Sequence, residues 1–234
     1  MPLVVQPLAF DDIPKYNSLF HDAFFDTPIG SIVHRAPPSA ASREAQIKKT
    51  AKQFHNPHTR FWKAVDADTG EIAAAAKWSF YTEDRAQAEV DEDTQVPAPG
   101  PESNEEGHMA FFGHIAQSQR EFLGTKKHAL LHVLMTHPRH RKRGAGSILL
   151  REGLAEADRL GLESYVAASE DGLPLYAKHG FEAVKAVTFD LAKYGSVEGT
   201  STNTIMIRPA RAKEGVESTV EAFVSSKTIS EPMS

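Results

Sequence analysis

The sequence contains no cysteine among its 234 residues. This absence excludes disulfide bonds, thiolate metal sites and a cysteine nucleophile. The sequence also has no apolar run close to the ~20 residues that a membrane-spanning helix needs, so we expect no membrane segment. Its N-terminal stretch lacks a charged start followed by a long apolar core, so we expect no signal peptide. These absences together predict a soluble, cytoplasmic protein.

Positive charge is also in short supply, with 26 Lys and Arg residues against 31 Asp and Glu residues and a net charge of −5. A chain with this balance does not favour nucleic acid through its bulk charge. Eleven histidines are present, but the pair His55 and His58 has no third ligand in view, which a metal site requires. We therefore expect neither a nucleic-acid partner nor a bound metal.

One short basic cluster, residues 139–143, stands out against this acidic background. An almost wholly apolar run over 130–135 precedes the cluster and is typical of a strand. A turn with two glycines, residues 144–146, follows it, and a helical pattern over 147–160 then stops at Gly161. The order of strand, basic glycine turn and helix organises the rest of the chain.

The physical chemistry of this turn favours an anion. The first N–H groups of a helix have no partner within the helix and lie at the positive end of its dipole, so they attract phosphate. Gly144 and Gly146 have no Cβ, which lets a ligand come close to the backbone. The turn is not a nucleotide P-loop or a dinucleotide fingerprint, because the Gly-Lys-Ser/Thr and the third glycine are missing. Basic runs also occur as nuclear-import signals, but the position directly before a helix favours phosphate binding.

Two motifs in this region resemble those of the GNAT-superfamily N-acetyltransferases. The first is the Arg-x-x-Gly-x-Gly sequence over 141–146, and the second is the Tyr-x-x-x-Gly-Phe sequence over 176–181. The matching region covers about 130–192, roughly a quarter of the chain. It is also similar to the arylalkylamine acetyltransferases and to the small-amine and antibiotic acetyltransferases. The resemblance implies an α/β (α+β) fold of three layers, with a central mixed, mostly antiparallel twisted sheet flanked by helices.

The resemblance further implies that acetyl-CoA is the co-substrate and that the turn's backbone amides hold its pyrophosphate. The end of the preceding strand offers backbone groups to the pantetheine arm, and Ser169 lies where the family often has an asparagine that contacts the cofactor. The hydroxyl of Ser147 either binds a phosphate or caps the helix. The predicted cofactor-binding residues are Leu134, Met135, Thr136, Arg141, Lys142, Arg143, Gly144, Ala145, Gly146, Ser147 and Ser169.

Tyr176 is the predicted general acid. Pro174 starts its short helix and Gly180 ends it, which gives the tyrosine a fixed direction. A phenol with a pKa near 10 is protonated at neutral pH and can donate a proton to a leaving sulfur. The resembled family has its general acid at this position. The alternative is an ordinary, partly buried tyrosine.

His132 is the candidate general base, because it is the one titratable group inside an otherwise apolar strand. Burying a histidine without a partner is unfavourable, and its pKa suits proton transfer. The resembled arylalkylamine enzymes place two histidines on this strand, one aligned with His132 and the other with Leu130. The alternative is a core histidine that bonds to a backbone carbonyl, and the sequence leaves both open.

The rest of the chain predicts a single domain over 1–210 and a C-terminal tail over 211–234. Thr82 to Gly107 holds nine Asp or Glu residues against one Arg, with few apolar residues. Such a composition buries too little surface to offset its ordering entropy. We interpret it as a flexible inserted loop, with an acidic partner-binding loop as the alternative. Further strands are expected at 3–6, 61–65, 72–80, 164–168, 181–191 and 204–207, and further helices at 12–25, 40–54, 109–122 and 216–224.

The sequence therefore predicts an enzyme that moves an acetyl group from acetyl-CoA to a primary amine of a small molecule. One alternative acceptor is a peptide N-terminus or a lysine side chain. A second alternative is a non-catalytic module that binds coenzyme A. The oligomeric state is not predicted.

Overall fold

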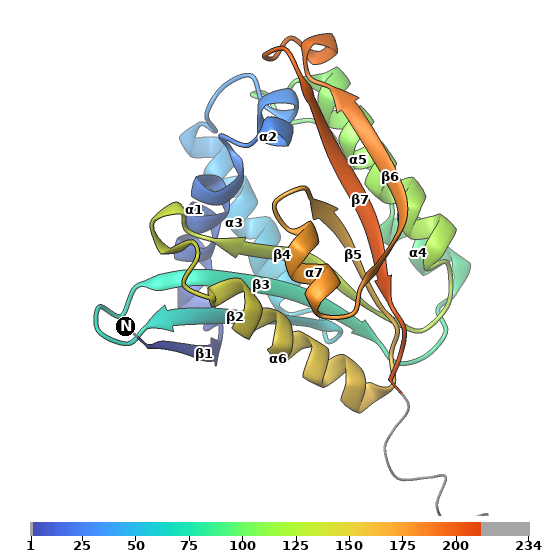
Figure 1. Cartoon of the computed structure of the whole chain (residues 1–234). Coiled ribbons are helices and arrows are strands. Elements are labelled where there is room, and N and C mark those ends of the chain that lie inside the picture. Colours follow the sequence, from blue (N-terminus) through green and yellow to red (C-terminus); the bar gives the residue numbers. More distant parts are fainter. Residues whose placement is uncertain (1, 212–234) are drawn as a thin grey trace, which may run out of the picture.

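The computed structural model describes residues 2–211, and the predicted helix at 216–224 lies outside them. A seven-stranded sheet in the order β1-β2-β3-β4-β5-β7-β6 forms its centre (Figure 1). Neighbouring strands are antiparallel except for β4 and β5, which run parallel. The strands are β1 Leu3–Pro7, β2 Thr59–Asp66, β3 Ile72–Tyr81, β4 His128–Thr136, β5 Ser164–Ser169, β6 Glu182–Asp190 and β7 Thr200–Arg208.

Helices cover both faces of the sheet and give the three layers that the resemblance implies (Figure 1). The helices α6 and α7 pack on one face, whereas α1 and α3 lie on the other and α5 lies against β6 and β7. The helices are α1 Ile13–Phe24, α2 Pro28–Val33, α3 Ala40–Phe54, α4 Gln87–Asp93, α5 Glu105–Phe122, α6 Ala145–Leu160 and α7 Leu173–Lys178. None of the helices in the described part of the chain has the length and hydrophobicity needed to cross a membrane.

The helix α6 is held close to the sheet by its apolar stripe. Leu149, Leu150 and Leu154 are buried against the sheet, spaced so that they share one face of a helix. Gly153 lies directly over Trp78 of β3, where an added Cβ would come within 2.3 Å of the indole. This contact requires a glycine and holds the middle of α6 against the sheet, while Gly146 at the start of the helix lies close to Leu134 and Thr136 of β4.

The parallel strands β4 and β5 pair over only three residue pairs, the last of which joins Leu131 and Val166. Beyond that pair, β5 continues along β7 and β4 continues along β3. We call the point where the two strands part the fork. Since no strand of the described residues pairs with β4 on its β5 side beyond the fork, its backbone groups there are available to an extended ligand.

The interpretation of Thr82–Gly107 as a loop is wrong in part, because α4 and the start of α5 form within it. Val90 and Thr94 are buried, and Arg85 caps this arrangement through an ion pair with Asp93. The acidic composition concealed a short helix with one apolar side. The helix α2 was not predicted, because Pro28 looked like an end to α1. It instead takes the first position of a new helix, which Thr27 caps through its hydroxyl.

Candidate active site

A β-bulge places His132 at the fork. On the antiparallel pair β3–β4, Lys77 lies opposite Val133 and the next residue, Trp78, lies opposite Leu131. His132 is therefore an extra residue on β4, and such a residue is re-aimed relative to its neighbours. Its side chain faces a cavity on the α3 and α5 side of the sheet, the same side as Leu130.

The imidazole of His132 shares a hydrogen bond with a serine of the adjacent strand. The Oγ atom of Ser79 lies 2.8 Å from Nε2 of His132 and 3.4 Å from Oγ1 of Thr59. The Nδ1 atom of His132 makes no hydrogen bond to any described residue. Desolvation, followed by the nearby charges of Lys77 and His128, holds the pKa of His132 well below its ordinary value. The ring is therefore neutral at pH 7, with one nitrogen open to the cavity.

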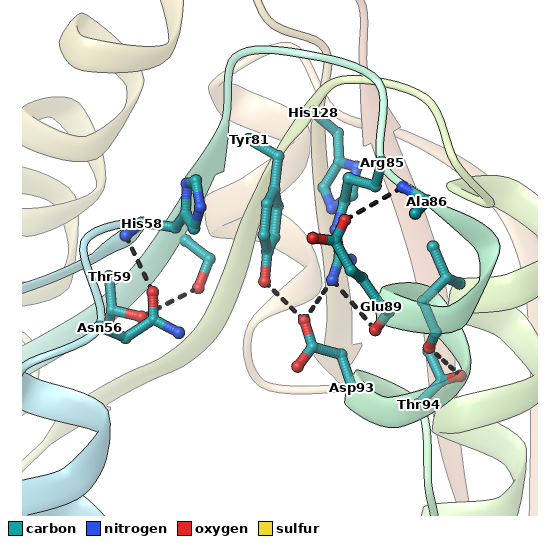
Figure 2. A network of polar contacts seen from close by, with 12 residues as sticks. Asn56, His58, Thr59, Tyr81, Arg85, Ala86, Glu89, Asp93, Thr94 and His128 are labelled. Carbon is teal, nitrogen blue, oxygen red and sulfur yellow. Dashed lines mark hydrogen bonds and ion pairs between the residues drawn. The ribbon is translucent and has the colours of Figure 1, made fainter.

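The cavity has a volume of about 270 Å³ and is bounded by β3, β4 and the helices α3, α4 and α5. The side formed by α4 belongs to the segment that the sequence analysis interpreted as a loop. Figure 2 shows how this wall is attached: Asp93 of α4 accepts hydrogen bonds from the Tyr81 hydroxyl, at 2.8 Å, and from the Arg85 guanidinium. The Arg85 guanidinium also lies 3.9 Å from the centre of the Tyr81 ring. These contacts hold α4 and Arg85 against β3 on one side of the cavity, whereas His132 is an exposed residue.

Sequence reasoning missed the polar groups that line this cavity. Lys77 and Ser79 lie on β3, which reads as an ordinary strand, and Gln53 lies at the end of a polar helix. Only the pairing of distant segments brings these residues together, and the sequence carries no local signal for it. The aromatic residues Phe24 and Phe25, at the end of α1, do not line the cavity. Phe24 packs against the core on the α1 side of the sheet, and Phe25 stacks between two histidines.

The glycine turn lies on the opposite face of the sheet, between the end of β4 and α6. Gly144 has a φ of +83° and serves as the N-cap of α6, a left-handed conformation that glycine adopts without strain. The first intrahelical bond is made by the N–H of Ile148, so the N–H groups of residues 145–147 have no partner among the described residues. An added Cβ at Gly146 would lie 3.4 Å from Leu175 and 3.9 Å from Thr136. The turn therefore forms a cradle of open amides that fits a phosphate group.

The basic residues before the turn have different surroundings. Arg141 and Lys142 are exposed. Arg143 instead contacts Asp66 at the end of β2, with 2.8 Å between nitrogen and oxygen, and its guanidinium lies 2.6 Å from Nδ1 of His140. The pKa of Asp66 is lowered by its hydrogen bond with Arg143. This ion pair ties the turn to the sheet.

Ser147 does not cap α6, because Gly144 occupies the cap position. The Ser147 hydroxyl instead lies 3.2 Å from Nε2 of His179, which follows α7. Leu134 and Thr136 lie on the cradle side of β4, whereas Met135 is buried against the α1 side. Ser169 ends β5, on the other side of the fork from these residues.

Tyr176 lies on α7, on the same face of the sheet as the cradle. Its side chain packs on Phe181 and in the core beside Leu131 and Val166, the residues that close the fork. Burial raises the pKa of Tyr176. Its hydroxyl makes no hydrogen bond to any residue that the structure describes. The site therefore has a protonated phenol on one side of the fork and a neutral imidazole on the other.

In residues 2–211, no three His, Asp or Glu side chains are grouped so that they could hold a metal ion. The model of the acetyltransferase (GNAT) family matches residues 28–181, which is well over half of the chain. The protein therefore belongs to the GNAT family of acetyltransferases and is an acyltransferase. The expected fold is thereby confirmed, and acetyl-CoA is the co-substrate that this family uses.

Solved structures support the same fold. The arylalkylamine N-acetyltransferase 2 from Aedes aegypti is 12% identical with a TM-score of 0.68, covering 90% of this chain and 100% of that chain. A histone acetyltransferase HPA2-related acetyltransferase from Corynebacterium glutamicum is 21% identical with a TM-score of 0.60, covering 92% and 100%. The polyamine N-acetyltransferase of Drosophila melanogaster is 14% identical with a TM-score of 0.60, covering 88% and 99%. No curated protein matches the chain in sequence.

Proposed function

We propose that the protein transfers the acetyl group of acetyl-CoA to the primary amine of a small molecule that binds in the cavity at the fork. The observation that carries the proposal is the position of this cavity. It meets the open edge of β4 at His132, and the amide cradle lies on the opposite face of the same strand. Donor and acceptor thus approach one point from opposite faces of the sheet.

The donor side holds the diphosphate of acetyl-CoA against the first N–H groups of α6, as the motif over 141–146 implies. Arg141 and Lys142 add positive charge at the rim of the cradle. The pantetheine arm follows the unpaired edge of β4 along Leu134–Thr136. Arg143 acts by holding the turn in place through Asp66, since its guanidinium is engaged there.

His132 removes the proton from the amine. An aliphatic amine with a pKa near 10 is only about one-thousandth free base at pH 7, so a nearby base assists attack. When Nε2 donates its hydrogen to Ser79, Nδ1 carries the lone pair and faces the cavity. The lowered pKa of His132 keeps that lone pair available at neutral pH. Ser79 thereby orients the base.

Tyr176 donates the proton that the departing thiolate needs. The amine nitrogen bonds to the thioester carbon, the carbon–sulfur bond breaks, and the sulfur takes the phenolic proton, while the nitrogen sheds its second proton to solvent as the amide forms. Burial raises the pKa of Tyr176, so the phenol is protonated before the carbon–sulfur bond breaks. The proton that His132 gained and the one that Tyr176 lost are exchanged with solvent after the products leave.

The size of the cavity favours a small acceptor. Its volume of about 270 Å³ lies just below the roughly 300–1,000 Å³ typical of ligand pockets. The helices α4 and α5 lie over it, fixed by the contacts of Asp93 (Figure 2). A peptide main chain needs an extended groove, so a small amine suits a cavity of this size better than a protein tail.

The proposal is tested by thermal melting followed by a thiol-release assay. Acetyl-CoA at 100 times its Kd stabilises the folded state by about 2.7 kcal/mol and raises the Tm. The thiol assay then measures turnover with small amines and with peptides that carry a free N-terminus or a lysine. We expect turnover with small amines only.

Absence of a Tm shift at high excess of acetyl-CoA would overturn the donor assignment. A shift without thiol release from any acceptor would identify a non-catalytic coenzyme A-binding module. Turnover with peptides but not with small amines would move the acceptor to proteins.

A further inference from the structure

The cavity contains an unbalanced positive charge. Of the residues that line it, three carry a full charge at pH 7: Lys77, Arg85 and Asp93. Asp93 is engaged by Arg85 and by the Tyr81 hydroxyl, at the wall shown in Figure 2. Lys77 remains, and no carboxylate of the described residues lies within 4 Å of its ammonium group.

The surroundings of Lys77 hold this charge without neutralising it. The side chain is 9% exposed, and its ammonium group donates one hydrogen bond, of 2.9 Å, to the neutral amide oxygen of Gln53. Two of its three N–H donors therefore have no partner among the described residues. The ring of Phe61 lies 6.0 Å away and supplies at most a weak cation–π contact. Asp93 attracts this charge only from beyond ion-pair distance, and a buried charge without an ion-pair partner is unfavourable in the absence of a ligand.

Lys77 also lies next to the place where the amine must react. It pairs with Val133, the residue that follows His132 on β4. Neighbouring residues on adjacent antiparallel strands have Cβ atoms about 4.5–5.5 Å apart. A molecule whose amine reaches His132 can therefore bring a second group to Lys77 only if the two groups are separated by a few bonds.

We propose that Lys77 binds a carboxylate of the acceptor, so that the protein acetylates a small amino acid rather than a polyamine or an arylalkylamine. This inference rests on the proposed function and specifies its acceptor. A protonated polyamine would bring a second positive charge towards Lys77, whereas a carboxylate supplies the missing negative charge. Burial lowers the Lys77 pKa to about 8, so the side chain is mostly charged at pH 7.

The experiment compares each proteinogenic amino acid with its decarboxylated amine in the thiol-release assay at pH 7, with acetyl-CoA in excess. We expect the amino acid to be preferred within the pairs that react. Lys77→Gln raises KM for the amino acid by about 10- to 100-fold, the amount that one charged hydrogen bond contributes. It leaves kcat nearly unchanged and does not weaken turnover of the amine. Lys77→Arg restores much of the preference.

The matched control is Lys48→Gln, which removes an exposed lysine of α3 that pairs with Glu44 on the surface. A Tm shift by acetyl-CoA, measured on every variant, reports that each one is folded. The inference is overturned if the wild type prefers the amines and if Lys77→Gln does not change the ratio of activity with the amino acid to activity with its amine. The proposed function stays intact in that case. Equal loss of kcat with both members of a pair would make Lys77 a base and also overturns it. No thiol release with any amine overturns both proposals.

Discussion

The two sides of the fork are built from different chemical groups, backbone amides on one side and side chains on the other. The cradle side uses backbone amides over residues 144–147, which lie within one continuous stretch of chain. The cavity side uses side chains from β3, β4 and three helices that are far apart in the sequence. A backbone site recognises a part that is common to every donor, while a side-chain site can vary with the acceptor. The comparison explains why a motif predicts a donor site, whereas no motif predicts the acceptor.

The largest expected effect is on kcat, and it comes from a change at Tyr176 that separates the chemical step from cofactor binding. Tyr176→Phe removes the phenolic hydroxyl and keeps the ring, so kcat falls by about 100- to 10,000-fold, the usual contribution of a general acid. The Kd for acetyl-CoA, measured by calorimetry, stays within about twofold. Tyr194→Phe is the matched control, because Tyr194 lies on the distant turn after β6. Unchanged turnover in Tyr176→Phe means that another group protonates the sulfur.

A second change tests the cavity side at His132. His132→Gln keeps a hydrogen-bonding group beside Ser79 but removes the base, and kcat/KM falls by about 100-fold. The sign of the pH effect follows from the lowered pKa: the base loses its proton more readily, so wild-type activity declines only at pH well below 6.5. The variant loses this acidic limb of the pH profile. If the acidic limb persists in His132→Gln, it arises from another titrating group.

Binding of acetyl-CoA at the cradle is tested by a substitution that fills the cradle with a side chain. Gly146→Val places a side chain against Leu175 and over the open amides, so the Kd for acetyl-CoA rises by about tenfold, as expected for loss of one charged hydrogen bond. Gly113→Val is the control, because a Cβ at Gly113 meets no atom within 4 Å. Calorimetry with coenzyme A gives both values. Equal affinity in the two variants would place the diphosphate elsewhere.

A smaller effect is expected from the ion pair that ties the turn to the sheet. Asp66→Asn removes the ion pair with Arg143 and loosens the turn, which raises the Kd for acetyl-CoA by roughly threefold, the scale of a single ion pair. Because the folded pKa of Asp66 is lowered, its contribution to stability is present above pH 3.8 and is lost as the pH falls through the folded pKa. Thermal melts across pH measure this loss. The exposed neighbour Asp68, changed to Asn, should alter neither quantity.

The difference between the two sides also shows how far sequence reasoning reaches. The glycine turn, α6 and Tyr176 were predicted, because anion binding at a helix N-terminus needs a few residues at fixed local spacing. His132 was predicted as a base, but its bulge and its bond to Ser79 depend on the register with β3. Lys77 carried no signal at all, since one lysine in a strand ordinarily faces solvent.

The acidic segment over 82–107 shows a second limit. Its composition indicates a solvated loop, and most of its acidic side chains are indeed exposed. The helix α4 forms there because Val90 is buried and because Asp93 accepts hydrogen bonds from Tyr81 and from Arg85, which lies in the same segment. Arg120 of α5 also donates hydrogen bonds to Thr94, which follows the helix. Specific side-chain contacts that composition does not reveal therefore decided the structure of this segment.

The most direct test of the account is a crystal structure with coenzyme A bound. We predict that the diphosphate lies against the N–H groups of residues 145–147 and that the thiol ends at the fork, between Tyr176 and His132. The account is contradicted if the turn holds no phosphate, or if the thiol lies away from the fork with the cavity unconnected to it.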